Sequence, residues 1–240
     1  MNEVQNSGMI RRKMQAYWYR FGRWLCKVFC VLFFRLRTYG QDNIPGEGPF
    51  IVVSNHQSYL DPIFCGVGVH RDICYMARDT LFRNRILGKA IASVNAIPVK
   101  RGSADLTAIR KVIEKLNLGM GVCLFPEATR SPDGRVAAFK GGFTILCKRT
   151  DAMIVPTVID GAYECWPRHR KLWSRGLVVV CYGEPISSAQ AKAMDDRALA
   201  DLLTRRIRTM QHKWRKKLGK EPFDYSSEAE FDNNPRPDGR

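Results

Sequence analysis

The chain has 240 residues, 45% of them hydrophobic and 26% charged, so it can bury the core of one domain and is neither disordered nor fibrous. Its net charge of +16 comes from 39 basic and 23 acidic residues. Two acid-free segments hold this excess, with eight basic residues in 10–38 and eight in 204–220, and the remaining 23 basic and 23 acidic residues balance. Two cationic segments on a neutral body predict contact with an anionic surface, either nucleic acid or phospholipid.

The first predicted element is an amphipathic helix over residues 10–38. Its longest apolar stretch, residues 24–34, is interrupted by Lys27 and is too short to cross a bilayer, which takes about 20 residues. No small-residue cleavage site follows, so a signal peptide is not expected. One side carries apolar residues at steps of three and four: Met14, Trp18, Phe21, Leu25, Val28, Leu32 and Leu36.

An aromatic, basic amphipathic helix of this kind is typical of a segment that lies in a membrane interface. A helix that packs on the core, with Lys13, Arg20, Arg23 and Lys27 on a solvated face, remains the alternative. Nucleic-acid binding is disfavoured, because the aromatic residues join the apolar side and do not alternate with the basic residues.

The body is predicted to alternate strands and helices. Strands are expected at 50–53, 73–77, 96–100, 122–125, 153–159 and 177–182; helices are expected at 81–94, 103–118 (capped by Ser103), 142–148 and from Ser187 or Ser188 to 218. This order predicts an α/β fold with a mostly parallel central sheet flanked by helices. We therefore divide the chain into an attachment segment (1–40), a folded body (41–220) ending in the cationic helix, and a disordered polar tail (221–240).

Eight cysteines lie inside apolar runs with no C-x-x-C pair, which favours buried, reduced thiols over a disulfide framework or a zinc ribbon.

The first group of polar residues with chemical potential is Asn55-His56-Gln57-Ser58-Tyr59-Leu60-Asp61-Pro62, which follows a predicted buried strand. The ends of parallel strands face the ligand crevices of open α/β sheets. The loop between His56 and Asp61 is short enough for the carboxylate to accept a hydrogen bond from His56 Nδ1 and leave Nε2 free as a base. The alternative is a structural loop histidine, with Asp61 as the N-cap of a helix that has Pro62 in its first turn.

The second group is Phe125-Pro126-Glu127-Ala128-Thr129-Arg130-Ser131, which also follows a predicted strand. Arg130 can grip a phosphate with two nitrogens. Arg101 ends another predicted strand, and Lys140 precedes Gly141-Gly142 at a predicted helix start. Each residue alone is also explained as a turn or surface salt-bridge residue, but together they place one base and several cations at the ends of adjacent strands.

These residues resemble the glycerolipid acyltransferase family, in particular the bacterial-type 1-acylglycerol-3-phosphate acyltransferases. Asn55-His56 with Asp61 matches its N-H-x-x-x-x-D block, and residues 125–131 match F-P-E-G-T-R-S with one change, about 70 residues later. Residues 97–101 and 154–157 resemble two further blocks, and the resemblance covers residues 45–185. The one departure is Ala128 in place of glycine, which adds strain of about 1 kcal/mol if the position needs a positive φ.

The resemblance implies that His56, oriented by Asp61, removes the proton from the sn-2 hydroxyl of lysophosphatidate, without an acyl-enzyme. It also implies an acceptor pocket in which arginine neutralises the phosphate; its residues would be Arg101, Glu127, Thr129, Arg130 and Lys140. No metal or bound cofactor is expected; acyl-CoA or acyl carrier protein brings the acyl chain as co-substrate. The expected location is the cytoplasmic face of a membrane, contacted through residues 10–38 and 204–220, with no nucleic acid.

Three alternatives stay open from the residues. The same fold can serve another acceptor, such as glycerol-3-phosphate, another lysophospholipid, or a non-phosphorylated alcohol or amine. It can act as a hydrolase in which His56 activates water, or as an adaptor that binds a membrane or nucleic acid through its two cationic segments. Activity with different acceptors distinguishes these possibilities.

Overall fold

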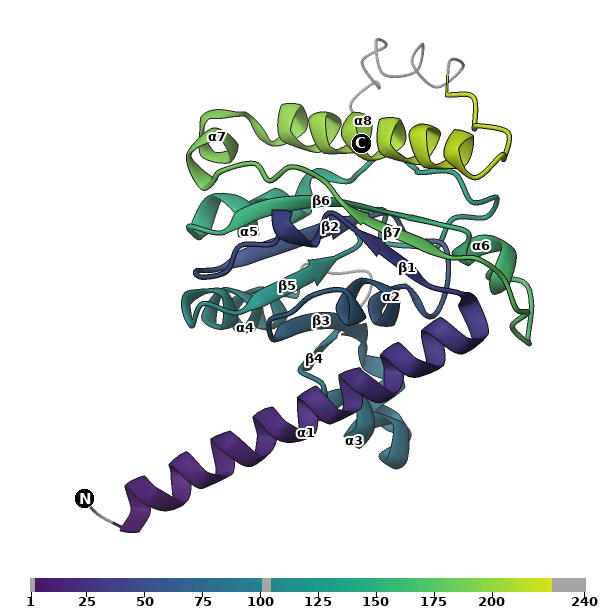
Figure 1. Ribbon diagram of the computed structural model, residues 1–240. Helices are drawn as coiled ribbons and strands as arrows, with labels where there is room; N and C mark the ends of the chain where they lie inside the picture. Colours follow the sequence, from purple (N-terminus) through teal and green to yellow (C-terminus); the bar gives the residue numbers. More distant parts are fainter. Residues whose placement is uncertain (1–2, 101–104, 226–240) are drawn as a thin grey trace.

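The structure, a computed structural model, describes residues 3–100 and 105–225. At its centre is a seven-stranded sheet with the order β1-β7-β6-β2-β5-β3-β4 (Figure 1). Neighbouring strands are parallel except β6 and β7, which are antiparallel. The predicted α/β class with a mostly parallel sheet is therefore confirmed. The strands are β1 (Arg37–Tyr39), β2 (Phe50–Ser54), β3 (Ile73–Arg78), β4 (Ala96–Val99), β5 (Gly121–Leu124), β6 (Met153–Asp160) and β7 (Val179–Tyr182).

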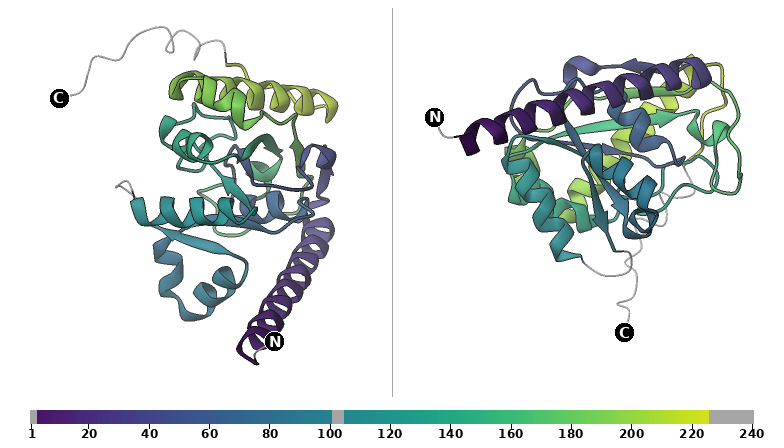
Figure 2. Two further views of the ribbon diagram at one scale, coloured as in Figure 1. Left: turned by 90° about the vertical axis from the view of Figure 1, so that its left-hand side faces the viewer. Right: turned by 90° about the horizontal axis from the view of Figure 1, so that it is seen from below.

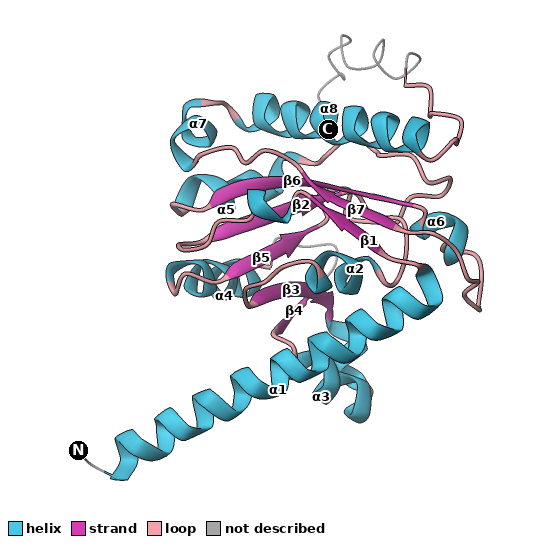
Figure 3. Ribbon diagram, viewed as in Figure 1, coloured by secondary structure: helices cyan, strands magenta, loops and turns pink. Residues whose placement is uncertain are grey.

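Helices cover both faces of the sheet (Figure 3). The α-helices are α1 (Glu3–Phe34), α2 (Asp61–Val67), α3 (Arg85–Ser93), α4 (Leu106–Asn117), α5 (Thr144–Arg149), α6 (Ala162–Cys165), α7 (Ser188–Ala193) and α8 (Asp196–Lys217). Short 3-10 helices are η1 (Gln41–Asn43), η2 (Asp79–Arg83) and η3 (Gly141–Phe143).

The central strand β2 explains why both faces are covered. Its side chains alternate, with Ile51 and Val53 in a core shared with α4, α5, α7 and α8, and Phe50 and Val52 in a core shared with α1, α2 and α6. All five residues of β2 are buried. The consequence is that α1 and α8 pack on opposite faces of the sheet, as the left panel of Figure 2 also shows.

Several elements differ from the sequence prediction. The predicted helix 81–94 is divided at Asn84, whose side chain caps α3 after the 3-10 helix η2. The predicted last helix is divided, because Met194 and Asp195 have extended backbone angles and the Asp195 side chain caps a new helix, α8, by accepting from the N–H of Ala198. Strand β1 lies inside the segment assigned to membrane attachment and pairs with β7, so the predicted boundary at residue 40 cuts through the sheet. The predicted N-cap Ser103 lies outside the described residues, and Asp105 caps α4.

Helix α1 turns its predicted apolar stripe away from the body. Its exposed large apolar residues form what we call the outer face of α1. These are Met14, Tyr17, Trp18, Phe21, Trp24, Leu25, Val28, Val31 and Leu32. The side that packs on the core carries Tyr19, Cys30 and Phe34, which are nearly or fully buried. The helix is thus apolar on two opposite sides, of which only one is covered.

The sequence pattern placed Arg23 on a solvated basic face of the helix. The structure does not bear this out. Its guanidinium points to the body and donates to the backbone oxygens of Val69 and Arg71, at 2.7 and 3.1 Å. These carbonyls follow α2, so Arg23 fastens α1 to the end of that helix.

The chain after α8 is ordered over its described part, residues 221–225, which differs from the predicted disordered tail; residues 226–240 lie outside the described range. The Tyr225 hydroxyl donates to Gln211 Oε1 at 2.7 Å and accepts from the N–H of Val136 at 2.8 Å. All eight cysteines are unpaired, and six of them are buried. Within residues 3–100 and 105–225, no helix has both the length and the hydropathy needed to cross a membrane.

Candidate active site

The candidate site forms where two central strands end side by side. β2 and β5 are parallel neighbours, with Val53 beside Leu124. His56 follows the end of β2 by two residues, and Glu127 follows the end of β5 by three. Two loops with polar residues therefore leave the same edge of the sheet, as expected from the parallel arrangement.

His56 and Asp61 form the predicted pair. His56 Nδ1 lies 2.8 Å from Asp61 Oδ2, and the same oxygen accepts from the backbone N–H of Gln57 and, at 2.7 Å, of Ser58. Asp61 is fully buried. A carboxylate only accepts hydrogen bonds, so the proton lies on Nδ1 and the lone pair of Nε2 is free.

The predicted N-cap role of Asp61 is wrong. Asp61 is the first residue of α2, Leu60 occupies the cap position without a side-chain hydrogen bond, and Pro62 lies in the first turn as expected. The carboxylate instead turns back to the loop that carries His56. It thus fixes the loop backbone and the imidazole together.

The imidazole is held in place but remains accessible. Its ring stacks on Phe125, with centroids 4.5 Å apart and an interplanar angle of 27°. Its side chain is 18% exposed, and Nε2 has no hydrogen-bond partner among the described residues. A ring oriented on one side and open at Nε2 is suited to take a proton from an external hydroxyl.

The loop after β5 is attached directly to His56. The backbone N–H of Ser131 donates to His56 O at 2.7 Å, and the N–H of His56 donates to Glu127 Oε1 at 3.0 Å. Burial raises the pKa of the Glu127 carboxyl to about 8, and the nearby Asp61 carboxylate acts in the same direction. The Glu127 carboxyl therefore keeps its proton to a higher pH than an ordinary carboxyl, and in that form it contributes hydrogen-bonding capacity to the site without charge.

Arg130 lies on the same side of the structure as the histidine loop. Its guanidinium carbon is 3.4 Å from the centroid of the Tyr59 ring, three residues after His56. One of its terminal nitrogens is buried and has no hydrogen-bond acceptor among the described residues. Arg130 thus combines a fixed position with unused donors, a combination suited to an anionic ligand.

The other predicted binding residues lie at the border of the site or outside the described residues. The Thr129 side chain is exposed, with its hydroxyl 3.5 Å from a guanidinium nitrogen of Arg168. The backbone N–H of Lys140 donates to Pro126 O at 3.2 Å, so Lys140 borders the loop, but its side chain points to solvent without a partner among the described residues. Arg101 lies outside the described residues.

Comparison with known proteins gives the family of the chain. The profile of the Acyltransferase family matches residues 35–160, just over half of the chain. The chain belongs to the Acyltransferase family. It is an acyltransferase, and both loops of the site lie within the matched region.

Several relatives carry a more specific name. The 1-acyl-sn-glycerol-3-phosphate acyltransferase of Bacillus subtilis is 27% identical over 200 residues, covering 81% of this chain and 98% of that protein. A chloroplastic enzyme of the same name from Arabidopsis thaliana is 27% identical over 187 residues, covering 75% of this chain. This chain spans about half the length of the plant enzyme, 52%. A crystal structure of the 1-acyl-sn-glycerophosphate acyltransferase PlsC from Thermotoga maritima superposes with a TM-score of 0.70 at 26% identity, covering 83% of this chain and 82% of that one.

The candidate site has a supporting residue that sequence reasoning missed. Gln57 is buried, and its amide donates to Gly134 O at 2.7 Å and accepts from the N–H of Tyr163 at 3.2 Å. It joins the histidine loop to the loop after β5 and to α6. Its position next to His56 in the first block was the only available signal, because its partners lie 77 and 106 residues away in the sequence.

Ala128 of this acyltransferase has a φ of 60°, in the left-handed region that favours glycine. Its N–H donates to Phe125 O at 3.0 Å, which closes a tight turn just after β5. The strain expected at the departure from the family pattern is thus present in the backbone. We expect Ala128→Gly to raise the free energy of unfolding by about 1 kcal/mol, because glycine adopts this φ without a Cβ penalty.

Chemical denaturation of Ala128→Gly beside the unchanged protein measures this effect. The control is Ala137→Gly, a second exposed alanine in the same connection whose φ is not positive, where glycine should be neutral or destabilising. Equal or lower stability of Ala128→Gly would show that the turn relaxes around alanine at no cost.

Proposed function

We propose that this acyltransferase transfers an acyl chain from an acyl thioester, either acyl-CoA or acyl carrier protein, to the sn-2 hydroxyl of 1-acylglycerol-3-phosphate. The observation that carries the proposal is the union of two features at one edge of the sheet. These are an imidazole with a fixed tautomer and a free Nε2, and an arginine with unused donors on the loop bonded to it. The names of the bacterial relatives support the same acceptor.

His56 is the general base in this mechanism. Nε2 takes the proton of the sn-2 hydroxyl as the oxygen attacks the thioester carbonyl, and Asp61 stabilises the imidazolium that forms. The tetrahedral intermediate then expels the thiolate, and His56 returns its proton to that sulfur. The products are phosphatidate and a free thiol, with no acyl-enzyme.

Arg130 is proposed to bind the acceptor phosphate. Tyr59 holds the guanidinium plane, so that little side-chain entropy is lost when the phosphate binds. Glu127, as a neutral carboxyl, and Thr129, with its exposed hydroxyl, can add hydrogen bonds to the glycerol. Arg101 and Lys140 remain further candidates for the phosphate.

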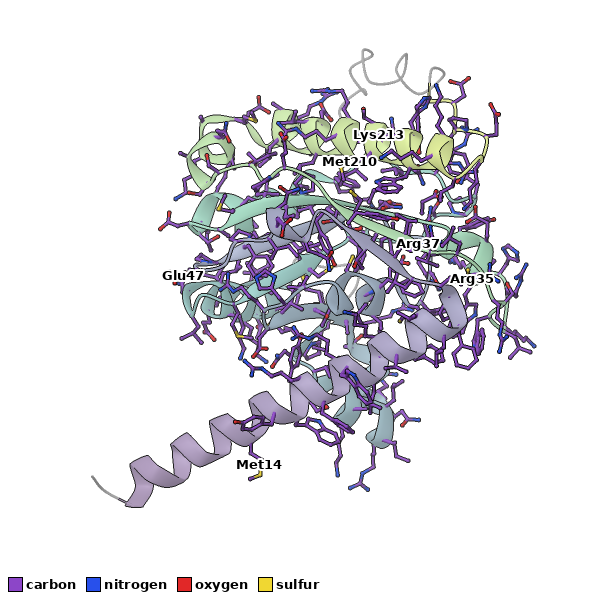
Figure 4. The ribbon with its side chains drawn as sticks, viewed as in Figure 1. Met14, Arg35, Arg37, Glu47, Met210 and Lys213 are labelled. Atoms are coloured by element: carbon purple, nitrogen blue, oxygen red, sulfur yellow. The ribbon has the colours of Figure 1, made fainter. Side chains whose placement is uncertain are left out.

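We also propose that the outer face of α1 attaches the enzyme to a membrane, on the cytoplasmic side, where free thiols such as its cysteines stay reduced. α8 is a weaker second contact, because it lies across the sheet from α1. Figure 4 labels Met14 on α1 and Lys213 on α8, at opposite ends of the view. Two basic residues of the 204–220 segment are also used internally, since Arg215 and Lys220 pair with the buried Asp160.

The proposal is tested by comparing 1-acylglycerol-3-phosphate with 1-acylglycerol as acceptors. The unchanged enzyme should prefer the phosphorylated acceptor, and Arg130→Ala should reduce that preference roughly 10- to 100-fold, because charge-assisted hydrogen bonds to phosphate are lost. Arg206→Ala, an exposed arginine on α8, is the control.

Two results would contradict the proposal. If Arg130→Ala kept the full preference, the phosphate would be bound elsewhere. If thioester consumption did not rise on adding any acceptor, the enzyme would be a hydrolase in which His56 activates water.

A further inference from the structure

A cationic loop connects α6 to β7 at the same edge of the sheet as the site. We call residues 166–176 the rim loop. It contains Arg168, Arg170, Lys171 and Arg175, together with His169, and no acidic residue. It is a defined turn, because Trp166 Nε1 donates to Arg170 O at 3.1 Å and the N–H of Ser174 donates to Cys165 O at 2.8 Å.

One end of the rim loop borders the candidate site. The Trp166 ring lies 5.2 Å, centroid to centroid, from the ring of Tyr59, which holds Arg130 on its face. The guanidinium of Arg168 reaches the hydroxyl of Thr129. The loop therefore lies beside the residues proposed to bind the acceptor.

The other end of the rim loop packs on the last turns of α1. The Trp173 ring lies 5.0 Å from the ring of Phe33, 5.4 Å from that of Phe34 and 6.0 Å from that of Phe29. Arg175 lies over the Phe33 ring at 5.4 Å. Figure 1 shows the loop after α6 descending beside this end of α1. One short segment thus joins the last turns of α1 to the mouth of the site.

The middle of the rim loop offers an apolar tip between cations. Leu172 is 77% exposed, and Lys171 before it is also exposed. Within residues 3–100 and 105–225, no carboxylate forms an ion pair with Arg168 or Lys171. An exposed leucine next to cations that no carboxylate neutralises matches an anionic phospholipid surface, in which the leucine enters the acyl region and the cations meet the headgroups.

We infer that the rim loop is a second membrane contact, which binds anionic phospholipid and holds the mouth of the site against the bilayer. The inference rests on the proposed function only in that the acceptor is taken to be a membrane lipid. An acidic carrier protein would also match the cations. The tip of Leu172 and the packing of the loop on α1, whose outer face is apolar next to it, favour lipid.

The test uses the full chain with the double substitution Lys171→Glu and Leu172→Asp, both at exposed positions outside the core. Sedimentation is measured with vesicles of phosphatidylcholine, with and without phosphatidylglycerol. We expect the double variant to bind the anionic vesicles about tenfold more weakly or worse, with less change on phosphatidylcholine alone. Lys111→Glu, the same lysine-to-glutamate change at an exposed position of α4, on the opposite face of the sheet from α1 and outside both cationic segments, should bind as the unchanged protein does.

Turnover supplies the second measurement. The ratio of turnover on lysophosphatidate in anionic vesicles to turnover on a dispersed short-chain acceptor should fall about tenfold in the double variant and stay constant in Lys111→Glu. Unchanged vesicle binding by the double variant would overturn the inference. If the KM for the acyl donor rose while vesicle binding stayed unchanged, the loop would be assigned to donor binding instead. Vesicle binding is measured without turnover. If the protein showed no acyl transfer, the proposed function would be refuted, but sedimentation would still test the membrane contact of the rim loop.

Discussion

Replacing His56 by alanine is expected to lower kcat/KM for acyl transfer by about a thousandfold or more, because no other described group near the site combines a free basic nitrogen with a fixed orientation. The ring is partly exposed and its loss leaves the Asp61 bonds to the Gln57 and Ser58 N–H groups in place. The fold should therefore persist. Initial rates with lysophosphatidate and acyl-CoA, together with a thermal unfolding curve, measure both effects.

His212→Ala is the matched control, since that histidine is exposed on α8. Its variant should retain the rate of the unchanged enzyme. Near-normal turnover by His56→Ala would remove the base assignment, whatever the control shows.

The same prediction extends to Asp61, with a smaller expected loss for Asp61→Asn. Backbone N–H groups of Gln57 and Ser58 hold the Oδ2 position, so the amide oxygen of asparagine can occupy it and still accept from His56 Nδ1. The tautomer survives, but the negative charge that stabilises the imidazolium is lost. We expect turnover to fall roughly 10- to 100-fold, less than for His56→Ala.

The outer face of α1 supports the second large prediction. Changing Trp18, Leu25 and Leu32 together to serine should weaken binding to anionic vesicles by at least about a hundredfold. Each buried apolar side chain contributes about 1.5–3 kcal/mol to membrane partition. These side chains are 56%, 47% and 66% exposed, so the fold should not depend on them. Vesicle sedimentation measures the result.

Substitution is a cleaner test than deletion of the segment. Removing residues 1–38 would also remove the buried Phe34 and most of β1, which pairs with β7. Loss of membrane binding could then result from unfolding. Leu118→Ser is the control for Leu32→Ser, because Leu118 is 75% exposed at the end of α4, on the opposite face of the sheet. Full sedimentation of the triple variant would disprove attachment through this face.

The prediction for α1 also shows where sequence periodicity stops being informative. The spacing of apolar residues indicated a helix and one apolar stripe, and the helix is present. The stripe was compatible with membrane or core contact, because both remove apolar surface from water. Only the packing of Tyr19, Cys30 and Phe34 against the other helices shows that a different side meets the core.

The arginines illustrate the same limit. In the sequence, Arg23 and Arg215 were two of sixteen cations in acid-free segments. In the structure, Arg23 bonds carbonyls 46 and 48 residues away, and Arg215 pairs with a buried aspartate 55 residues away. No local pattern carries this information, since a guanidinium in a helix has the same spacing whether it meets solvent or a distant carboxylate.

The sequence by itself determined the local chemistry of this acyltransferase. His56 and Asp61 are five residues apart, so a short loop can join them. The strands could be predicted because a strand that is buried on both faces of the sheet needs a continuous run of apolar residues. The tertiary structure alone decided which distant groups meet: Arg130 over Tyr59, Gln57 between the loop after β5 and α6, and the rim loop between α1 and the site. Such contacts depend on strand order and helix packing, which bring together segments that share no local sequence signal.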